Sequence, residues 1–245
     1  MTETQIPNTR LSEAFAFAAW IHQDQYRKQA EGEDESLKIS YLTHLAEVLA
    51  IVIQGRGNED QQIAALLHDA IEDQPTTPNG DDTATEIKRL FGERALELVL
   101  HCTDGVPDAS GVKPPWRDRK EKHIQHMNEQ ATKDPEFLLV SIADKISNAQ
   151  AIVNDAIIDG PGVWNRFNAP PTGVVWYYTE MLQVFSSHLG TDNYLVKRLT
   201  YLVQALSKLA PKSAESDTNS GSDSDSEQKP IDVKPLRGFE FLYSF

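Results

Sequence analysis

Cysteine is almost absent from this sequence of 245 residues, in which Cys102 is the only one. A single thiol cannot form an intramolecular disulfide, so we expect a protein of the reducing cytoplasm. Basic residues are also scarce: 23 Lys and Arg stand against 37 Asp and Glu, which gives a net charge of −14. Such an acidic surface argues against broad binding to nucleic acid or anionic lipid, and an anionic small substrate would need a local basic pocket or a metal.

Long apolar runs are lacking as well. No stretch of the sequence approaches the roughly 18 apolar residues of a membrane span. The first ten residues have neither the basic start nor the apolar stretch of a secretory signal. No glycine-rich phosphate-binding motif is present, because neither Gly55-Arg56-Gly57 nor Gly160-Pro161-Gly162 fits one. We therefore expect a cytoplasmic protein with no membrane partner.

Helical periodicity, in contrast, runs through most of the chain. Leu45, Val48, Leu49, Val52 and Ile53 follow the i, i+3, i+4, i+7, i+8 pattern of one buried stripe. The same spacing predicts a helix over 11–26 and a third helix that starts at the N-cap Asp60 and carries the stripe from Ile63 to Ile71. Further helices are expected over 83–102 with a break at Gly92, and over 117–131, 135–157, 172–188 and 192–209. The pattern predicts an all-α fold, with a single compact helical bundle over residues 8–210.

The composition changes abruptly after this domain. Residues 211–229 are rich in Ser, Asp and Glu and contain too little apolar surface to fold alone, so we expect a disordered acidic linker. Residues 230–245 end in Phe-Glu-Phe-Leu-Tyr-Ser-Phe, with an aromatic side chain at every second position. In an extended strand these rings would project from one side. The segment is expected either to dock in a groove of its own domain or of a neighbouring subunit, or to be an unstructured end.

The stretch Leu66-Leu-His-Asp-Ala-Ile-Glu-Asp73 concentrates ionisable groups. In one continuous helix of 3.6 residues per turn, His68, Asp69, Glu72 and Asp73 share one arc opposite the apolar stripe. Three carboxylates and an imidazole so close together repel one another unless a cation joins them. This run therefore indicates a metal site, with a solvated acidic helix face as the other interpretation.

Two residues on other predicted helices favour the metal site. His44 lies beside an apolar stripe, where a lone histidine is more often a satisfied core residue than a ligand. Asp144 lies inside the apolar run Phe137-Leu-Leu-Val-Ser-Ile-Ala, where an aspartate costs several kcal/mol unless it is paired, hydrogen-bonded or metal-bound. Its alternatives are an ion pair with Lys145 or a helix cap. Asn148 follows at i+4, on the same helix face.

The order His…His-Asp…Asp is similar to that of the HD-domain phosphohydrolases. The fuller string resembles the hydrolase domain of RelA/SpoT homologues and the stand-alone small alarmone hydrolases, over roughly residues 10–205. The matching pieces are Arg27-Lys28, Tyr41–His44, Ala65–Asp73, Phe91-Gly92, Ala143–Asn148, Trp164 and Arg166. HDxxED with a downstream ADKxxN is a specific combination, since many unrelated HD enzymes share only the His-Asp pair.

The resemblance implies a metal centre and its catalytic groups. The implied metal ligands are His44, His68, Asp69 and Asp144. Two imidazoles and two carboxylates without a thiolate suit Mn²⁺ or Fe²⁺ better than a closed structural zinc site. By the same resemblance, Glu72 and Asp73 would position and deprotonate the attacking water.

The resemblance also implies a set of substrate contacts. The expected substrate-binding residues are Arg27, Lys28, Asn148, Arg117, Arg119, Lys120 and Arg166. Arg27 and Lys28 would meet the base and phosphates, and Asn148 would lie near the ribose. We expect Arg117, Arg119 and Lys120 to bind the distal phosphates, with an exposed helix face as the alternative. The twelve residues 29–40 replace a short glycine-containing turn of the family, which leaves the identity of the substrate open.

The implied activity is hydrolysis of the 3′-pyrophosphate of a nucleotide alarmone of the stringent response, (p)ppGpp-like or (p)ppApp-like, to nucleotide and pyrophosphate. The alternatives are another HD phosphohydrolase (a nucleotidase, phosphodiesterase or NADPH phosphatase) and a catalytically idle HD module that binds a nucleotide or a partner. The Glu72-Asp73 pair argues against an idle module, because a binder needs no water-activating carboxylate. The expected partner is a small-molecule nucleotide and not nucleic acid, while a homo-oligomer or a paired synthetase toxin stays open.

Overall fold

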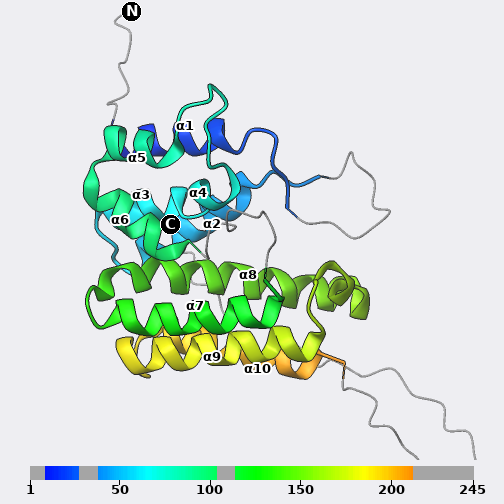
Figure 1. Cartoon of the computed structure of the whole chain (residues 1–245). Helices are drawn as coiled ribbons and strands as arrows, with labels where there is room; N and C mark the ends of the chain where they lie inside the picture. The colour runs from blue at the N-terminus through cyan, green and yellow to red at the C-terminus, as the bar shows by residue number, and fades with distance from the viewer. Residues whose placement is uncertain (1–8, 28–37, 104–113, 212–245) are drawn as a thin grey trace, which may run out of the picture. The chain divides into compact units, whose positions relative to one another are not determined.

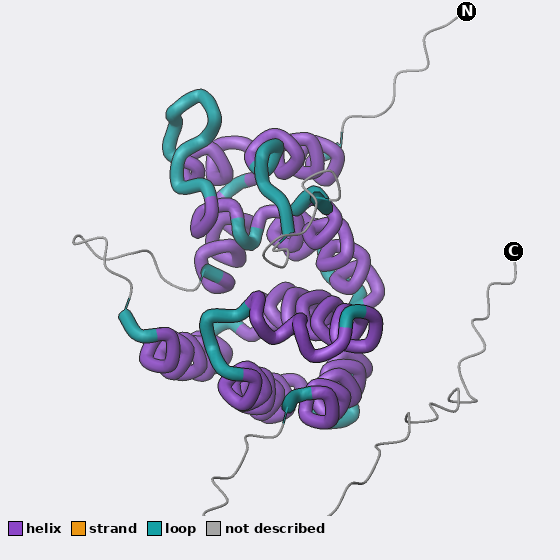
Figure 2. The backbone as a smooth tube through the Cα atoms, turned by 90° about the vertical axis from the view of Figure 1, so that its right-hand side faces the viewer, coloured by secondary structure: helices purple, strands orange, loops and turns teal. Residues whose placement is uncertain are grey.

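The computed structural model describes residues 9–27, 38–103 and 114–211. Within these ranges the chain is helical, with two isolated β-bridges and no longer strand (Figure 2). The elements in chain order are α1 (Arg10–Ile21), α2 (Leu42–Gln54), α3 (Glu59–Leu67), α4 (Ala70–Asp73), α5 (Thr83–Phe91), α6 (Glu93–Cys102), α7 (Trp116–Ala131), η2 (Pro135–Phe137), α8 (Leu138–Ile158), η3 (Gly160–Arg166), α9 (Pro171–Leu189) and α10 (Tyr194–Leu209). The predicted all-α fold is confirmed, as is the break at Gly92, whose φ of 89° suits glycine.

Helix α8 lies at the centre of this bundle. It packs against α2 and α3 on one side and against α9 and α10 on the other (Figure 1). Leu138, Ile142 and Ile146 are fully buried apolar side chains of this helix. Asp144 is on the same helix and is only 8% exposed, so the fold places a carboxylate inside its own core. None of the described helices is long and apolar enough to cross a membrane.

Helices α2 and α3 form a hairpin through the turn Gly55-Arg56-Gly57. The turn needs unusual backbone, because Arg56 has a φ of 62° and the N–H of Gly57 donates to the carbonyl oxygen of Val52 at 2.9 Å. The short connection folds α3 back along α2, so that the start of α2 lies beside the end of α3. His44 and His68, at those two positions, come together with ring centroids 5.3 Å apart.

Two predictions about helix ends are wrong. Helix α1 ends at Ile21 and not at residue 26, because the chain after it pairs with residues 39–41 across the bridge Tyr26–Ser40. The backbone N–H of Arg27 donates to Ile39 at 2.9 Å, and this pairing replaces helical hydrogen bonds. Helix α3 begins after Asn58 and not after Asp60, because the Asn58 side chain and Gln61 form a reciprocal capping box.

The third predicted helix is also not continuous. Helix α3 ends at Leu67, and His68 and Asp69 form a turn before the short α4. The His68 ring lies 2.9 Å from the carbonyl oxygen of Ala65, one of the last acceptors of α3, and so caps this end of the helix. The single arc predicted for these four residues is therefore replaced by two groups, His68 and Asp69 in the turn and Glu72 and Asp73 on α4.

The α2–α3 turn generates a prediction about stability. A Cβ added at Gly57 would lie 2.5 Å from Val52 Cγ1 and 3.1 Å from Leu139 Cδ2. We expect Gly57→Ala to lower the free energy of unfolding by about 1–3 kcal/mol, because an extra methyl is forced into a packed contact. Thermal or urea unfolding measures this loss. The control is Gly162→Ala, since a Cβ there meets nothing within 4 Å; equal stability of the two variants would contradict the prediction.

Candidate active site

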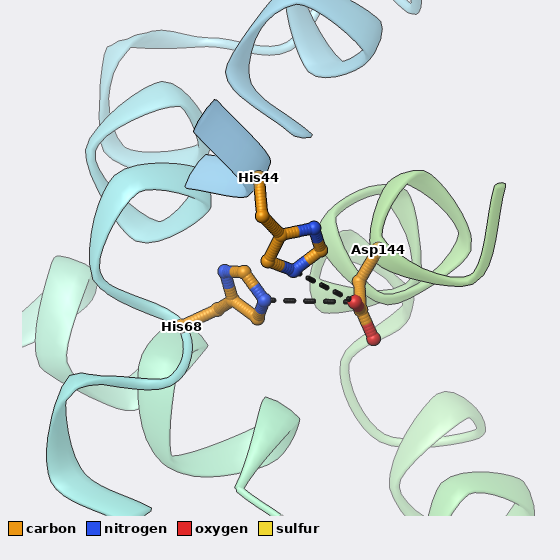
Figure 3. Close-up of side chains that lie close together, drawn as sticks. All are labelled: His44, His68 and Asp144. Carbon is orange, nitrogen blue, oxygen red and sulfur yellow. Dashed lines mark ion pairs between the residues drawn. The ribbon is translucent and has the colours of Figure 1, made fainter. Parts of the chain in front are cut away.

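Three side chains from separate elements converge on one buried point. His44 comes from α2, His68 from the turn after α3 and Asp144 from α8, and Figure 3 shows both imidazoles directed at the carboxylate. One potential ligand atom of each lies within 4.8 Å of those of the other two. Asp144 Oδ1 is 3.3 Å from His44 Nε2 and 3.7 Å from His68 Nε2. The hairpin and the central helix thus bring together residues that are 24 to 100 positions apart.

Asp69 joins this cluster from the same turn as His68. Its Oδ2 atom is 3.0 Å from His68 Nε2 and 3.7 Å from His44 Nε2. The hydroxyl of Tyr41 donates a short hydrogen bond to that oxygen, which orients the carboxylate. Burial, together with the negative charge of Asp69, raises the pKa of Tyr41, so the phenol stays protonated as a donor. The four predicted metal ligands are therefore neighbours.

The two imidazoles carry the best test of whether a cation fits. Nδ1 of His68 faces Ala65 O, and Nδ1 of His44 lies 3.0 Å from Ser147 Oγ. Both Nε2 atoms are buried, and neither makes a hydrogen bond. A buried polar atom of this kind costs about 1–3 kcal/mol. Two such atoms that face two carboxylates fit ligands of a divalent cation, which the donor set of nitrogen and oxygen also favours.

The charges of the cluster act strongly on one another. Burial alone would raise the pKa of Asp69, but the adjacent His68 outweighs it and holds the pKa at about 2. Burial would lower the pKa of His68, yet the nearby carboxylates of Asp69 and Asp144 raise it well above the ordinary value. The two carboxylates thus favour positive charge at this point, which a divalent cation would supply.

A cavity of about 640 Å³ opens beside this cluster and is called here the substrate cavity. Its wall near the cluster contains Tyr41, Glu72 and Asp73, and its other charged lining residues include Arg119, Lys120 and Lys145. The volume is in the range of small-molecule sites. In a chain with a net charge of −14, these cations make a locally basic pocket next to a metal-ligating cluster.

Several predicted substrate-binding residues line the substrate cavity. Arg27 and Asn148 both line it, and Arg27 Nη2 donates to Asn148 Oδ1 at 3.5 Å. The Asn148 amide also donates to Asp144, so it connects the cavity to the metal cluster. Arg166 lines the cavity too, where its Nη1 atom forms an ion pair with Asp155 at 2.7 Å.

The predicted basic patch on α7 is divided. Arg119 and Lys120 line the substrate cavity, and Lys120 Nζ lies 4.7 Å from the centre of the Tyr177 ring. Arg117 is not among the lining residues: it pairs with Glu121 at 2.7 Å and stacks on Trp176 at 3.2 Å. Lys28 lies outside the described residues.

The structure adds residues that the sequence alone did not indicate. Gln25 donates to Asp73 Oδ2 at 2.6 Å and lies 2.7 Å from His22 Nδ1, so two residues after α1 support a predicted catalytic carboxylate. Asp73 keeps access to water through the open cavity, yet the loss of solvation around it, with the charge of Asp69, raises its pKa. Lys145 pairs with Asp144 at 2.7 Å while it also lines the cavity. The Gln25–Asp73 contact spans 48 residues, so no local pattern indicates it, whereas the Lys145 ion pair was one predicted alternative for Asp144.

Comparison with known proteins identifies the family. A family model described as "HD domain" matches residues 14–174, about two thirds of the chain. This chain belongs to the HD-domain family. That membership agrees with the cluster of His44, His68, Asp69 and Asp144 and implies that the HD-domain chain binds a divalent metal.

Two individual relatives show which kinds of HD-domain protein this chain is similar to. The chain is 29% identical over 197 residues to the mouse guanosine-3′,5′-bis(diphosphate) 3′-pyrophosphohydrolase MESH1. The aligned region covers 80% of this chain and 93% of that protein. It is 28% identical over 158 residues to the Escherichia coli bifunctional (p)ppGpp synthase/hydrolase SpoT, which covers 62% of this chain and 20% of that protein. The chain thus spans about a fifth of the length of SpoT and of several other bacterial relatives.

Solved structures support the fold. The structure of a metazoan orthologue of SpoT that hydrolyses ppGpp superposes with a TM-score of 0.57 at 24% identity and covers 82% of this chain and 97% of that one. A Listeria monocytogenes protein superposes with a TM-score of 0.54 at 22% identity, over 67% of this chain and 99% of that one. At these identities the likeness establishes the shared helical fold.

The cluster generates a prediction about metal content. We expect the purified HD-domain protein to contain about one divalent metal per chain and Asp144→Ala to lose it, because the carboxylate that faces both imidazoles is removed. Elemental analysis measures the content. Asp155→Ala is the control, since it removes a half-exposed carboxylate of the same helix that pairs with Arg166. Full occupancy in Asp144→Ala would show that Asp144 is not a ligand.

Proposed function

We propose that this HD-domain protein hydrolyses the 3′-pyrophosphate of a purine nucleotide alarmone to a nucleotide and pyrophosphate, with Mn²⁺ or Fe²⁺ as its metal. The observation that carries the proposal is the juxtaposition of the cluster His44, His68, Asp144 with a cavity that Arg119, Lys120 and Lys145 make basic. The names of MESH1 and SpoT, which describe guanosine bis(diphosphate) hydrolysis, support it.

The cationic side chains would bind the phosphates. Lys120 and Lys145 both face the Tyr177 ring, with their Nζ atoms 4.7 and 5.8 Å from its centre. This contact places two ammonium groups beside one aromatic surface in the wall of the cavity, where Lys145 also pairs with Asp144. Arg27, which also lines the cavity, would give the substrate a further cationic contact. An anion with several phosphates fits a cavity lined by these cations.

The metal ligands would be His44, His68, Asp69 and Asp144. When bound, a divalent cation supplies Lewis-acid chemistry, because it polarises a phosphoryl oxygen and lowers the pKa of water. Two imidazoles and two carboxylates, with no thiolate, match the preference of Mn²⁺ or Fe²⁺. Asn148 and Lys145, which both bond to Asp144, hold that carboxylate in place from the substrate side.

Glu72 and Asp73 would handle the proton of the attacking water. Both residues line the substrate cavity from α4, one turn after the ligand pair His68-Asp69. The raised pKa of Asp73 brings that carboxylate closer to the working range of a general base near neutral pH. Gln25 fixes its orientation through the hydrogen bond to Oδ2. Either carboxylate could thus accept the proton, and replacing each one in turn distinguishes their roles.

A panel of nucleotides tests the proposed activity. Protein loaded with Mn²⁺ is incubated with ppGpp, ppApp, NADPH, a nucleoside monophosphate and a cyclic dinucleotide, and the products are separated by chromatography. We expect pyrophosphate and a nucleoside 5′-diphosphate from ppGpp or ppApp. Inorganic phosphate from NADPH or from the monophosphate would indicate a phosphatase or nucleotidase. Binding without any product would indicate an idle module.

Replacement of Glu72 by Gln tests its role as a base. The variant keeps the size and hydrogen-bonding reach of the side chain but cannot accept the proton. We expect metal content to be unchanged and turnover to fall about 10²–10⁴-fold, the usual contribution of general acid–base catalysis. The same measurement on Asp73→Asn separates the two carboxylates. Turnover near that of the wild type in Glu72→Gln would mean that Asp73, or the metal alone, activates the water.

A further inference from the structure

A chain of hydrogen bonds leads from His44 to the protein surface. The Nδ1 atom of His44 lies 3.0 Å from Ser147 Oγ, and the Ser147 hydroxyl donates to Glu47 Oε2 at 2.7 Å. His44 and Ser147 are 1% and 3% exposed. Glu47 is exposed, one turn after His44 on α2, and lines a second cavity of about 680 Å³ between α2 and α8. Neither Ser147 nor Glu47 belongs to the predicted site.

Counting protons fixes the direction of both hydrogen bonds. A hydroxyl has one proton, and a carboxylate can only accept, so the Ser147 proton lies on the bond to Glu47. The Ser147 oxygen must then accept from His44, which places a hydrogen on Nδ1 of the ring. In the neutral imidazole, the lone pair is therefore on Nε2, the atom 3.3 Å from Asp144 Oδ1. His68 reaches the same state differently, because its Nδ1 faces a backbone carbonyl oxygen.

We infer that Ser147 and Glu47 are positioning residues that hold His44 in the tautomer and orientation of a metal ligand. The inference rests on the proposed metal site. Glu47 draws the Ser147 hydroxyl toward itself and so leaves the serine oxygen as a fixed acceptor for the imidazole. A carboxylate linked to a ligating histidine also increases the basicity of the ring, and partners of this kind typically contribute 10–100-fold to metal affinity.

The hydrogen bonds from His44 through Ser147 to Glu47, called here the relay, connect two helices. Because Ser147 is on α8 and His44 and Glu47 are on α2, the relay crosses the contact between these helices. Asp144 stands three residues before Ser147 on α8, so the same two helices supply both ligands and the bond that aligns them. A serine that merely filled space at this contact would need no acceptor at the surface.

Metal affinity without any nucleotide tests the inference. The metal-free wild type, Ser147→Ala, Glu47→Ala and Glu47→Gln are titrated with Mn²⁺, and free Mn²⁺ is followed by electron paramagnetic resonance. The melting temperature of each metal-free protein is recorded in parallel. We expect Ser147→Ala to bind Mn²⁺ about 10–100-fold more weakly. Glu47→Ala should weaken binding while the metal-free melting temperature stays close to that of the wild type, because Glu47 is exposed. Glu47→Gln keeps an acceptor oxygen and should bind more tightly than Glu47→Ala.

Ser141→Ala is the matched control. Ser141 is a buried serine of the same helix, 5% exposed, and its hydroxyl contacts Cys102 Sγ at 3.5 Å and Met127 Sδ at 4.0 Å rather than a cluster histidine. It should lose stability like any buried serine but keep its Mn²⁺ affinity. Equal affinities of wild type, Ser147→Ala and Glu47→Ala would overturn the relay alone, as would an equal loss in Ser141→Ala. A wild type that binds no Mn²⁺ would overturn the metal site and the relay together, whereas failure to hydrolyse any alarmone would leave the relay intact.

Discussion

The burial of charge at the contact of α2, α3 and α8 is the constraint on which the rest of the site depends. Asp144 stands among fully buried apolar neighbours, and the Nε2 atoms of His44 and His68 face it without a hydrogen bond. Removing these groups from water is costly, and packing alone cannot compensate for it. The cluster could hold a metal ion, and a shared cation would compensate all of these groups at once.

Helix α8 connects the metal cluster to the substrate cavity. Asp144 points to the imidazoles, Lys145 bonds to Asp144 and lines the cavity, and Asn148 does the same one turn later. Ser147, on the other edge of that face, holds His44. Because these four residues share one helix, a shift of α8 would move Asp144 and the cavity-lining side chains together. This coupling suits a hydrolase in which water and phosphate must meet at a fixed distance.

The charges that line the cavity are opposite in sign to the net charge of the chain. A chain with a net charge of −14 repels a polyphosphate at long range. The cavity reverses the sign locally, since Arg27, Arg119, Lys120 and Lys145 all line it. Salt screens the distant acidic surface within about 10 Å, whereas the cations inside the cavity act at contact. An acidic protein can therefore bind an anionic nucleotide without binding nucleic acid broadly.

The sequence by itself determined the helices and the residue types of the cluster, because both are local properties. Apolar spacing of 3.6 residues predicts a helix wherever it recurs, and Gly92 marks the break between α5 and α6 at the expected place. An imidazole, a carboxylate and a second acidic pair within six residues likewise needed no knowledge of the fold. The helix ends were harder to predict from the sequence. Asn58 competes with Asp60 as a cap, and only the reciprocal hydrogen bonds with Gln61 decide between them.

Tertiary structure alone decided how the site is supported. Tyr41 meets Asp69 across 28 residues, Gln25 meets Asp73 across 48, and Ser147 meets His44 across 103. No periodicity encodes such pairs, because they exist only once the helices have packed against one another. The orientation in which α7 packs similarly places Arg119 and Lys120 at the cavity and Arg117 against Trp176. Residue type is written in the chain, but which side chain faces which is set by how the helices pack.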